Sequence, residues 1–317
     1  MKKVLVVGGA GYIGGAVTDA LLARQIPFTV YDSLLYEPHY LKPVDFIRGD
    51  VRDTALLKDV LANYTHVVWL AAIVGDGACA VTPELTTAVN RDAVQWLSGN
   101  FSNRIIFTST CSVYGEHDGE VDEEGVTGPL SLYAETKLQA EKFLAGGNAL
   151  IFRLGTAFGI SDTYSRPRMD LVANLMPVAA LTKGVITLNG GEQWRPMVHV
   201  KDIAEAIVSN LDRPVRGLYN LAAVNLQIKD LAKTCADLTG CKVNVVPMSG
   251  TDARDYKANT QKALRDGIFN AHTMHTIGDG VREFANLVRS GRIKHLENSV
   301  YFNVRHIGEL KEHGKFA

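Results

Sequence analysis

The chain has 317 residues, of which 46% are hydrophobic and 21% are charged, and its formal net charge is -1. This near-neutral balance offers no basic surface for nucleic acid. No apolar run reaches the roughly 18 residues of a membrane span, and the apolar N-terminal run passes into glycines, unlike a signal peptide. We therefore expect a soluble globular protein with neither a nucleic-acid nor a membrane partner.

The cysteines indicate neither a disulfide framework nor a metal site. Cys79, Cys111, Cys235 and Cys241 are far apart, and no CxxC or His/Cys ligand spacing is present. We expect four reduced thiols in a cytoplasmic protein without a metal.

Short apolar, β-branched segments alternate with helical patterns through the first half of the chain. Strands are predicted over residues 3–9, 28–33, 45–50, 66–72, 104–110 and 149–155, and helices over 13–24, 54–63, 83–100 and from 132. Nearly unbroken apolar strands separated by helices are typical of a parallel sheet covered on both faces. The fold class predicted is therefore α/β, with a doubly wound parallel Rossmann sheet.

Beyond about residue 155 the alternation is looser. A strand over 196–200, a helix from Asp202, a strand over 218–222, a helix over 228–239 and a strand over 242–247 are predicted. Asp202 and Glu205 are interpreted as the N-cap and capping-box partner of that first helix. No linker is evident, so we expect a smaller α/β lobe interleaved with the first domain. The Rossmann domain is assigned residues 1–155 plus about 196–222, and the C-terminal lobe residues 156–195 plus 223–317.

The segment "VLVVGGAGYIG" leads from a predicted strand through glycines into a helix. Gly9-x-Gly11-x-x-Gly14 fits the dinucleotide fingerprint, and Gly8-x-x-Gly11-x-x-Gly14 fits a variant spaced by threes. In either case backbone amides and the helix N-terminus can meet a pyrophosphate, and Tyr12 and Ile13 between the glycines join the predicted contacts.

Asp32 ends the second predicted strand, 18 residues after Gly14 (32 minus 14). A carboxylate at this spacing binds the adenosine ribose and repels a 2'-phosphate, which favours NAD over NADP. Further cofactor contacts are assigned to strand ends, where a plain turn or core packing is the alternative explanation: Asp50, Val51, Leu70, Ala71 and Ala72.

The fifth predicted strand ends in "TSTCS", five small polar or thiol side chains before Tyr114. Ligands bind at the carboxyl ends of such strands, although a Ser/Thr-rich turn is the alternative. In the next helix, Tyr133 and Lys137 are four residues apart and share a face. They can form an ordinary surface pair, or the cation can lower the phenol pKa and make Tyr133 an acid/base.

The ordered motifs "GGAGYIG", Asp32, "GDVRD", "LAA", "STCSVYG", "YAETK", "RLGTAFG" and "RPMVHVKDIAEAI" cover most of the chain. The sequence resembles the extended short-chain dehydrogenase/reductases, and within them the NAD-dependent epimerase/dehydratase family acting on nucleotide sugars. The resemblance implies that Tyr133 is the catalytic acid/base, that Lys137 lowers its pKa and holds the nicotinamide ribose, and that Thr110 completes the triad. It also implies a homodimer formed through the Tyr133 helix and the 83–100 helix.

On the substrate side, the resemblance makes the C-terminal lobe the binding lobe for a nucleotide sugar. Arg195 matches an arginine that contacts the nucleotide, Asn174 an amide that reaches the diphosphate, and Arg254 a second phosphate-binding arginine. Ser112 lies where some related epimerases carry a cysteine, and it is placed among the substrate contacts. Arg166 and Arg168 are left open between substrate contact and loop surface.

The activity expected is hydride transfer at a sugar hydroxyl carbon, namely C4, by an epimerase. In the family's 4,6-dehydratases Asp and Glu follow the threonine; here Cys111 and Ser112 do, which argues against a dehydratase. A nucleotide-sugar 4-dehydrogenase or ketoreductase is the alternative. A dehydrogenase of steroid-like alcohols and a non-catalytic NAD-binding sensor or scaffold are further hypotheses. The tail from residue 297 is left without an assigned role, and we expect it to form a strand or short helix that caps the second lobe or touches a partner subunit.

Overall fold

The computed structural model describes residues 2–38, 40–247, 254–293 and 295–316. Its centre is a seven-stranded sheet in which every pairing is parallel. The strand order is β11 (Gly217–Leu221), β7 (Ala149–Leu154), β5 (Arg104–Thr110), β4 (His66–Trp69), β1 (Val4–Val7), β2 (Phe28–Asp32) and β3 (Phe46–Arg48). The order reverses between β1 and β4, where doubly wound sheets bind their ligands. The predicted fold class is confirmed.

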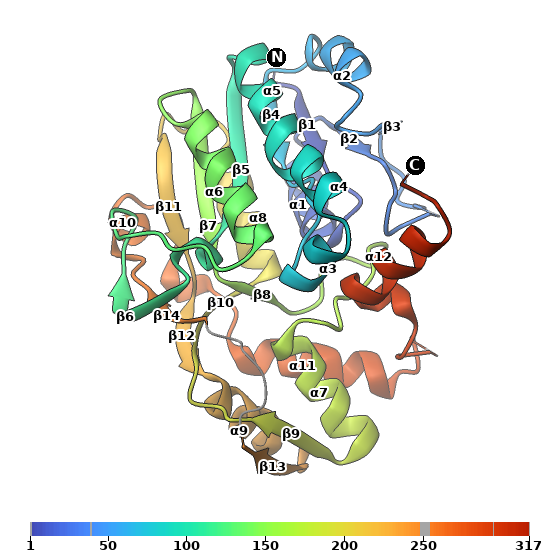
Figure 1. Ribbon diagram of the computed structural model, residues 1–317, viewed down its shortest axis with the longest axis vertical. Helices are drawn as coiled ribbons and strands as arrows, with labels where there is room; N and C mark the ends of the chain where they lie inside the picture. Colours follow the sequence, from blue (N-terminus) through green and yellow to red (C-terminus); the bar gives the residue numbers. More distant parts are fainter. Residues whose placement is uncertain (1, 39, 248–253, 294, 317) are drawn as a thin grey trace.

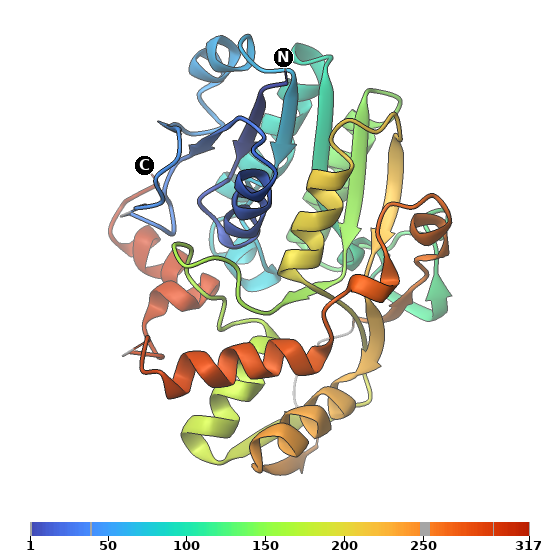
Figure 2. The same cartoon turned by 180° about the vertical axis from the view of Figure 1, so that it is seen from behind.

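Two helical layers cover the sheet (Figures 1 and 2). On one face α1 (Tyr12–Ala23) and α8 (Val200–Ser209) form a core with the strands, centred on Val17, Leu21, Ile203 and other fully buried aliphatic side chains. The other face is covered by α2 (Thr54–Leu61), α5 (Ala93–Asn100) and α6 (Leu132–Leu144). Both faces of the sheet are thus dry, which explains why its strands are apolar without alternation.

The helix predicted over 83–100 is continuous but not uniform. It consists of α4 (Pro83–Thr87), the π-helical turn η1 (Ala88–Asp92) and α5. Within η1 the buried Asn90 amide accepts a hydrogen bond from the Ile73 N–H at 2.8 Å and donates one to the Ile73 carbonyl at 2.9 Å. The π-turn therefore ties the loop after β4 to this helix, and π-turns often occur near functional sites.

The second lobe lies beyond the carboxyl ends of the strands (Figure 1). Its core is formed by α7 (Val172–Lys183), α9 (Ile228–Thr239) and α11 (Ile277–Arg289), packed against the pair β9 (Val185–Asn189) and β13 (Lys242–Val246). A three-stranded sheet of β8 (Thr156–Phe158), β10 (Trp194–His199) and β12 (Val224–Gln227) connects this lobe to the large sheet. Between these elements the chain returns to the large sheet through α8 and β11.

Shorter elements complete the fold. They are α3 (Asp76–Val81), η2 (Cys111–Tyr114), β6 (Glu116–Val121) paired with β14 (Asp255–Ala258), α10 (Gln261–Arg265), η3 (Ala271–Thr273), η4 (Ser299–Tyr301) and α12 (Asn303–Glu312). No helix within the described ranges has the length and apolar character needed to cross a bilayer.

The predicted N-cap of α8 is wrong. The helix begins at Val200, and the His199 side chain caps it by accepting a hydrogen bond from the Lys201 N–H. Asp202 instead accepts hydrogen bonds from His275, and Glu205 pairs with Arg24 of α1. Both carboxylates are bonded to residues outside α8, so the local capping pattern does not decide where the helix starts.

Candidate active site

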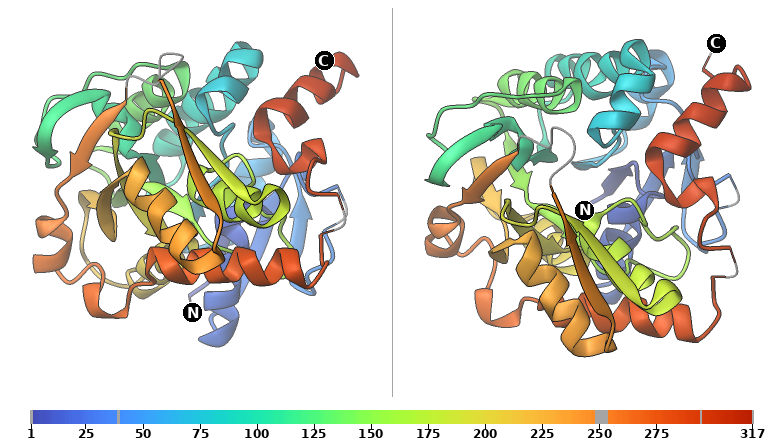
Figure 3. Two further views of the ribbon diagram at one scale, coloured as in Figure 1. Left: turned by 90° about the horizontal axis from the view of Figure 1, so that it is seen from below. Right: turned by 60° about the horizontal axis from the view of Figure 1, so that its bottom comes forward.

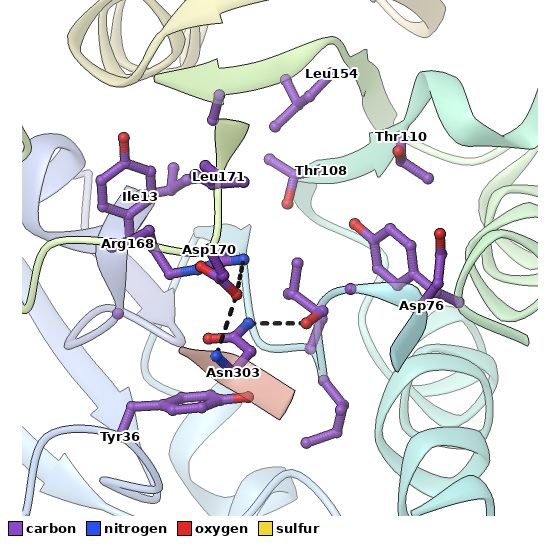
Figure 4. Close-up of a pocket in the computed structure, with 18 of the residues that line it drawn as sticks. Ile13, Tyr36, Asp76, Thr108, Thr110, Leu154, Arg168, Asp170, Leu171 and Asn303 are labelled. Atoms are coloured by element: carbon purple, nitrogen blue, oxygen red, sulfur yellow. Dashed lines mark hydrogen bonds and ion pairs between the residues drawn. The ribbon is translucent and has the colours of Figure 1, made fainter. Parts of the chain in front are cut away.

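A cavity of about 920 Å³ lies between the carboxyl ends of the strands and the second lobe. All but one of the residues predicted for cofactor, catalysis and substrate line it: Gly8, Gly11, Tyr12, Ile13, Gly14, Asp32, Asp50, Val51, Leu70, Ala71, Ala72, Thr110, Ser112, Tyr133, Lys137, Arg195 and Arg254. Figure 4 shows Ile13, Tyr36 and Arg168 on one side of it and Thr110 and Asp76 on the other.

The glycine turn after β1 forms a cradle that side chains would obstruct. A β-carbon at Gly8, whose φ is +83°, would lie 2.5 Å from the Ala71 nitrogen, and one at Gly14 would lie 2.4 Å from the Gly9 carbonyl oxygen. Gly11 is the N-cap of α1, and no side chain caps the helix or places an acid in its first turn. The N-terminal amides of α1 are therefore available to an anion, which fits the pyrophosphate of a dinucleotide.

Asp32 is held in place at the end of β2. Its Oδ2 accepts a hydrogen bond from the Ala10 N–H at 3.0 Å and its Oδ1 one from the Leu34 N–H at 2.8 Å. Burial raises the pKa of this carboxyl group, while the backbone N–H groups oppose that effect. Each oxygen keeps acceptor capacity toward the cavity, as a ribose diol requires. The glycine cradle and Asp32 together fit NAD.

The predicted triad is brought to one wall of the cavity. Ser131 caps α6 by accepting a hydrogen bond from the Ala134 N–H, which sets the start of the helix just before Tyr133. Lys137 follows one turn later, and Thr110 ends β5 with its Oγ1 accepting a hydrogen bond from the Ser112 N–H at 3.1 Å. The strand β5 and the helix α6 thus present the hydroxyl, the phenol and the ammonium to the same cavity.

The electrostatics of the pair differ from the sequence-based expectation. Burial raises the pKa of the Tyr133 phenol, the nearby Cys79 and Asp76 raise it further, and Arg168 and Thr110 lower it. Burial also lowers the pKa of Lys137 to about 7, against an opposing effect of Glu141. The protein groups alone therefore favour a protonated phenol, because the cost of burying a phenolate exceeds the stabilisation by Arg168 and Thr110.

Arg195 and Arg254 enter the cavity from the second lobe. Arg195 is nearly buried, and its Nη1 donates to the carbonyl of Trp194 at 2.8 Å and to that of Arg254. The Arg254 Nη1 lies 3.3 Å from the Asp76 Oδ2. Asp76 also accepts a hydrogen bond from the Ser131 hydroxyl at 2.6 Å. An ion pair therefore links the second lobe to the start of α3 across the cavity.

Asn174, assigned to the diphosphate, is the one predicted site residue whose side chain has other partners and lies outside the cavity lining. Asn174 does not line the cavity, and its side chain is fully buried in α7. Its Oδ1 accepts a hydrogen bond from the Gly159 N–H and its Nδ2 donates one to the Arg168 carbonyl, both at 2.9 Å. The amide is thus occupied in joining two loops to α7.

Sequence reasoning missed several polar groups of the cavity. Asp76 had no signal, since a single acid at the start of a short helix is unremarkable. Arg166 and Arg168 were left open; both are nearly buried and line the cavity. Arg168 forms a forked pair with Asp170, with Nε–Oδ1 and Nη2–Oδ2 distances of 2.6 and 3.0 Å. Arg168 and Asp170 stand two residues apart in the segment "RPRMD", but only the fold shows that both residues line the cavity.

The thiols play no evident part in the cavity. Among the described residues, Cys79, Cys111 and Cys235 are buried, Cys241 is half-buried, and all four are free. The part of the chain that the structure describes holds no group of three or more His, Cys, Asp or Glu side chains placed to bind a metal ion.

Comparison with known proteins identifies this arrangement. The model of the NAD dependent epimerase/dehydratase family matches residues 4–222. The chain belongs to the NAD-dependent epimerase/dehydratase family. As a member of this family it is an enzyme and uses NAD as its cofactor.

Its relatives within the family include curated epimerases and a solved cofactor complex. A UDP-glucose 4-epimerase of Corynebacterium glutamicum is 26% identical, over 83% of this chain and 89% of its own. A dTDP-L-rhamnose 4-epimerase of Burkholderia thailandensis is 26% identical, over 68% of this chain and 75% of its own. The structure of MoeE5 in complex with UDP-glucose and NAD superposes with a TM-score of 0.77 at 26% identity, covering 92% of this chain and 100% of that one.

Proposed function

We propose that this enzyme is a nucleotide-sugar 4-epimerase, which oxidises the sugar at C4 and reduces the resulting ketone from the opposite face. One observation carries the proposal: Tyr133, Lys137 and Thr110 open into the same cavity as Arg195 and Arg254. An acid/base group and two guanidinium groups in one space suit a substrate that has both an oxidisable hydroxyl and a diphosphate.

The diphosphate is the reason to favour a nucleotide sugar over an apolar alcohol. Arginine binds phosphate through forked donors, and a steroid-like alcohol carries no anionic group for Arg195 and Arg254 to bind. The curated relatives named above are 4-epimerases of UDP-glucose and dTDP-L-rhamnose, which supports the same substrate class.

Bound NAD supplies the hydride acceptor and a positive charge. The task of Tyr133 is to take the proton of the sugar hydroxyl, and Thr110 holds the phenol in position. Lys137, buried beside the Phe107 ring at 4.2 Å from its centroid, adds positive charge near the phenol when protonated. Since the protein groups alone raise the Tyr133 pKa, the positive charge of the cofactor is expected to complete the activation.

Dehydration has little support beside the triad. Cys111 follows Thr110, but its thiol is fully buried and donates to the Arg153 carbonyl at 3.3 Å, and the residue does not line the cavity. Ser112 lines the cavity but carries no group that titrates near neutral pH.

One observation favours a second candidate function. Asp76 lies in the cavity near enough to Tyr133 to raise its pKa. A carboxylate there can remove a proton from a ring carbon beside the ketone, which would invert a second centre or begin an elimination.

Product analysis in deuterated water separates these reactions. NAD-loaded protein is mixed with a panel of nucleotide sugars, reduced nicotinamide is followed by absorbance, and products are identified by mass and by NMR. A 4-epimer without deuterium and without lasting reduced cofactor supports the proposal. Deuterium on a ring carbon supports the role of Asp76, accumulating reduced cofactor indicates a dehydrogenase, and the absence of any new sugar contradicts the proposal.

The variant Tyr133→Phe tests the mechanism. Removing the hydroxyl is expected to lower kcat by about 10²–10⁴-fold, because general acid/base catalysis contributes that much. Bound NAD, measured after denaturing the protein, should be unchanged, since the phenyl ring still fills the wall of the cavity. A Tyr133→Phe enzyme with normal kcat would refute the assignment.

We also propose that the enzyme is a cytoplasmic homodimer. The resemblance implies that the 83–100 helix and α6 form the contact between subunits. These two helices lie side by side on the same face of the sheet (Figure 1). Sedimentation equilibrium, which reports mass independently of shape, is expected to give twice the 34.5 kDa of one chain. A single-chain mass at micromolar concentration would contradict the dimer.

A further inference from the structure

The C-terminal segment has no role in the chemistry proposed above. Residues 299–316, which we call the C-terminal strap, consist of η4, α12 and a short turn. The family match ends at residue 222, well before this segment. The strap crosses from the second lobe to the β2–β3 edge of the Rossmann domain, as Figures 1 and 3 show for the red C-terminal helix beside the blue strands.

At its start the strap is fastened to the second lobe through Arg166. The Arg166 Nη1 donates to the Val300 carbonyl at 2.6 Å, and its Nη2 donates to the Asn303 Oδ1 at 2.5 Å. The Asn303 N–H donates to the Asp170 Oδ2 at 3.1 Å. The guanidinium and the carboxylate that grip the strap both belong to residues that line the cavity.

The strap is equally fastened to the Rossmann domain. The Asn303 Nδ2 donates to the Val74 carbonyl at 2.8 Å, which Figure 4 shows as a dashed line. The His306 Nε2 donates to the Leu35 carbonyl at 2.9 Å, and the Lys311 ammonium donates to the Val81 carbonyl at 2.7 Å. These acceptors lie after β4, after β2 and at the end of α3. They are therefore on both sides of the point between β1 and β4 where the strand order reverses.

The strap also forms part of the cavity wall. Asn303, Val304, Lys315 and Phe316 line the cavity. Phe316 packs against the core cluster that contains Tyr31 and Val51, which is the side where Asp32 and Val51 are assigned to the adenosine. The neighbouring Tyr36 also lines the cavity, and its buried hydroxyl has no hydrogen-bond partner among the described residues. Such a phenol is a group that a bound ligand can satisfy.

We infer that the C-terminal strap is part of the NAD site: it closes over the adenosine half, and NAD dissociates only when the strap is displaced. The strap is hydrogen-bonded to both lobes and lines the cavity. Its displacement must therefore break hydrogen bonds to both lobes. The inference depends on NAD binding, which family membership establishes, and not on the sugar chemistry.

The structure offers a reversible lock to test this. A β-carbon at Gly77, in α3, would lie 3.8 Å from the Cβ of Val304 in the strap. That separation falls within the range of about 3.5–4.5 Å found in disulfides. The double variant Gly77→Cys/Val304→Cys therefore places a bond between the strap and the Rossmann domain, and a reductant removes it.

The experiment measures NAD release from the full-length protein. NAD-loaded double variant is oxidised or reduced, thiol titration establishes the state of the bond, and bound NAD is quantified after gel filtration at timed intervals. We expect oxidation to slow NAD release at least about tenfold, because changes at a binding site act mainly on the dissociation rate. Reduction should restore the release rate of the Val304→Cys single variant. Equal release rates in the oxidised and reduced forms would overturn the inference.

Two further variants approach the question from the opposite side. Asn303→Ala removes the two side-chain hydrogen bonds of this residue, to Arg166 and to the Val74 carbonyl, and Phe316→Ala removes the ring at the end of the strap. Each is expected to speed release by about tenfold, which corresponds to closure weakened by about 1.4 kcal/mol. Glu312→Ala, exposed at the end of α12, is the matched control and should not change the rate. Wild-type release rates in both Asn303→Ala and Phe316→Ala would contradict a strap that governs NAD exchange.

Discussion

At the scale of single residues, the burial of Lys137 lowers the free energy of unfolding near neutral pH. Its side chain is only 2% exposed, and burial lowers its pKa to about 7 from an ordinary value of 10.5. Between these values the unfolded chain binds more protons than the folded one, so the free energy of unfolding rises with pH over that window. Below about pH 7 the cost of burying the charge is fully present.

The variant Lys137→Met removes this cost. It is expected to raise the free energy of unfolding near pH 7 by on the order of 1–3 kcal/mol, with a gain that shrinks as the pH approaches 10. The same variant should lose hydride transfer. Chemical denaturation at several pH values measures the first effect, and Lys142→Met, exposed on the same helix, is the control. A variant less stable than wild type at pH 7 would contradict the argument.

At the scale of elements, a buried ion pair fixes α6 to the sheet. The Arg153 Nη2 on β7 lies 2.7 Å from the Glu141 Oε2 on α6, and both side chains are almost fully buried. The Ser109 hydroxyl on β5 donates to the same carboxylate. Because Glu141 follows Lys137 by one turn, these contacts set how α6 presents Tyr133 and Lys137 to the cavity.

Glu141→Ala is expected to lower the free energy of unfolding by about 3–5 kcal/mol, since it leaves Arg153 buried without its partner. Glu141→Leu/Arg153→Leu should recover most of that loss, because the second substitution removes the unpaired charge. Urea denaturation measures both, with the exposed Glu135→Ala of α6 as the control. A loss below about 1 kcal/mol in Glu141→Ala would show that α6 is held by packing alone.

At the scale of the whole molecule, the Asp76–Arg254 pair joins the two lobes across the substrate space. About a third of each side chain is exposed, so the pair contributes little to stability. On the proposal that Arg254 binds the substrate diphosphate, the pair matters for binding, because the diphosphate and Asp76 would compete for the same guanidinium.

Asp76→Asn is expected to tighten binding of uridine diphosphate by a few fold, and Arg254→Gln to weaken it, with both effects declining as salt is added. Isothermal titration measures the affinities, and Asp59→Asn, exposed on α2, controls for net charge. Weaker binding in Asp76→Asn would mean that Asp76 positions Arg254 rather than competing for it.

The local predictions that held are those in which one segment carries its own signal. The glycine turn needs residues without a Cβ, and the apolar strands are long enough to identify. The helix around Tyr133 carries its own Ser131 cap. Asn174 and Asp202 were assigned differently from what the structure shows because partners far along the chain, Gly159 and His275, occupy their side chains.

The sequence by itself determined the α/β class, the glycine turn after the first strand and the helix that carries Tyr133 and Lys137, because each depends on spacing within one strand, turn or helix. Only the tertiary structure decided the direction of the Tyr133 pKa shift, the pairing of Asp76 with Arg254 and the place of the strap over the cavity. These depend on burial and on contacts between residues more than 100 positions apart, such as Arg166 with Asn303, and long-range packing alone brings such groups together.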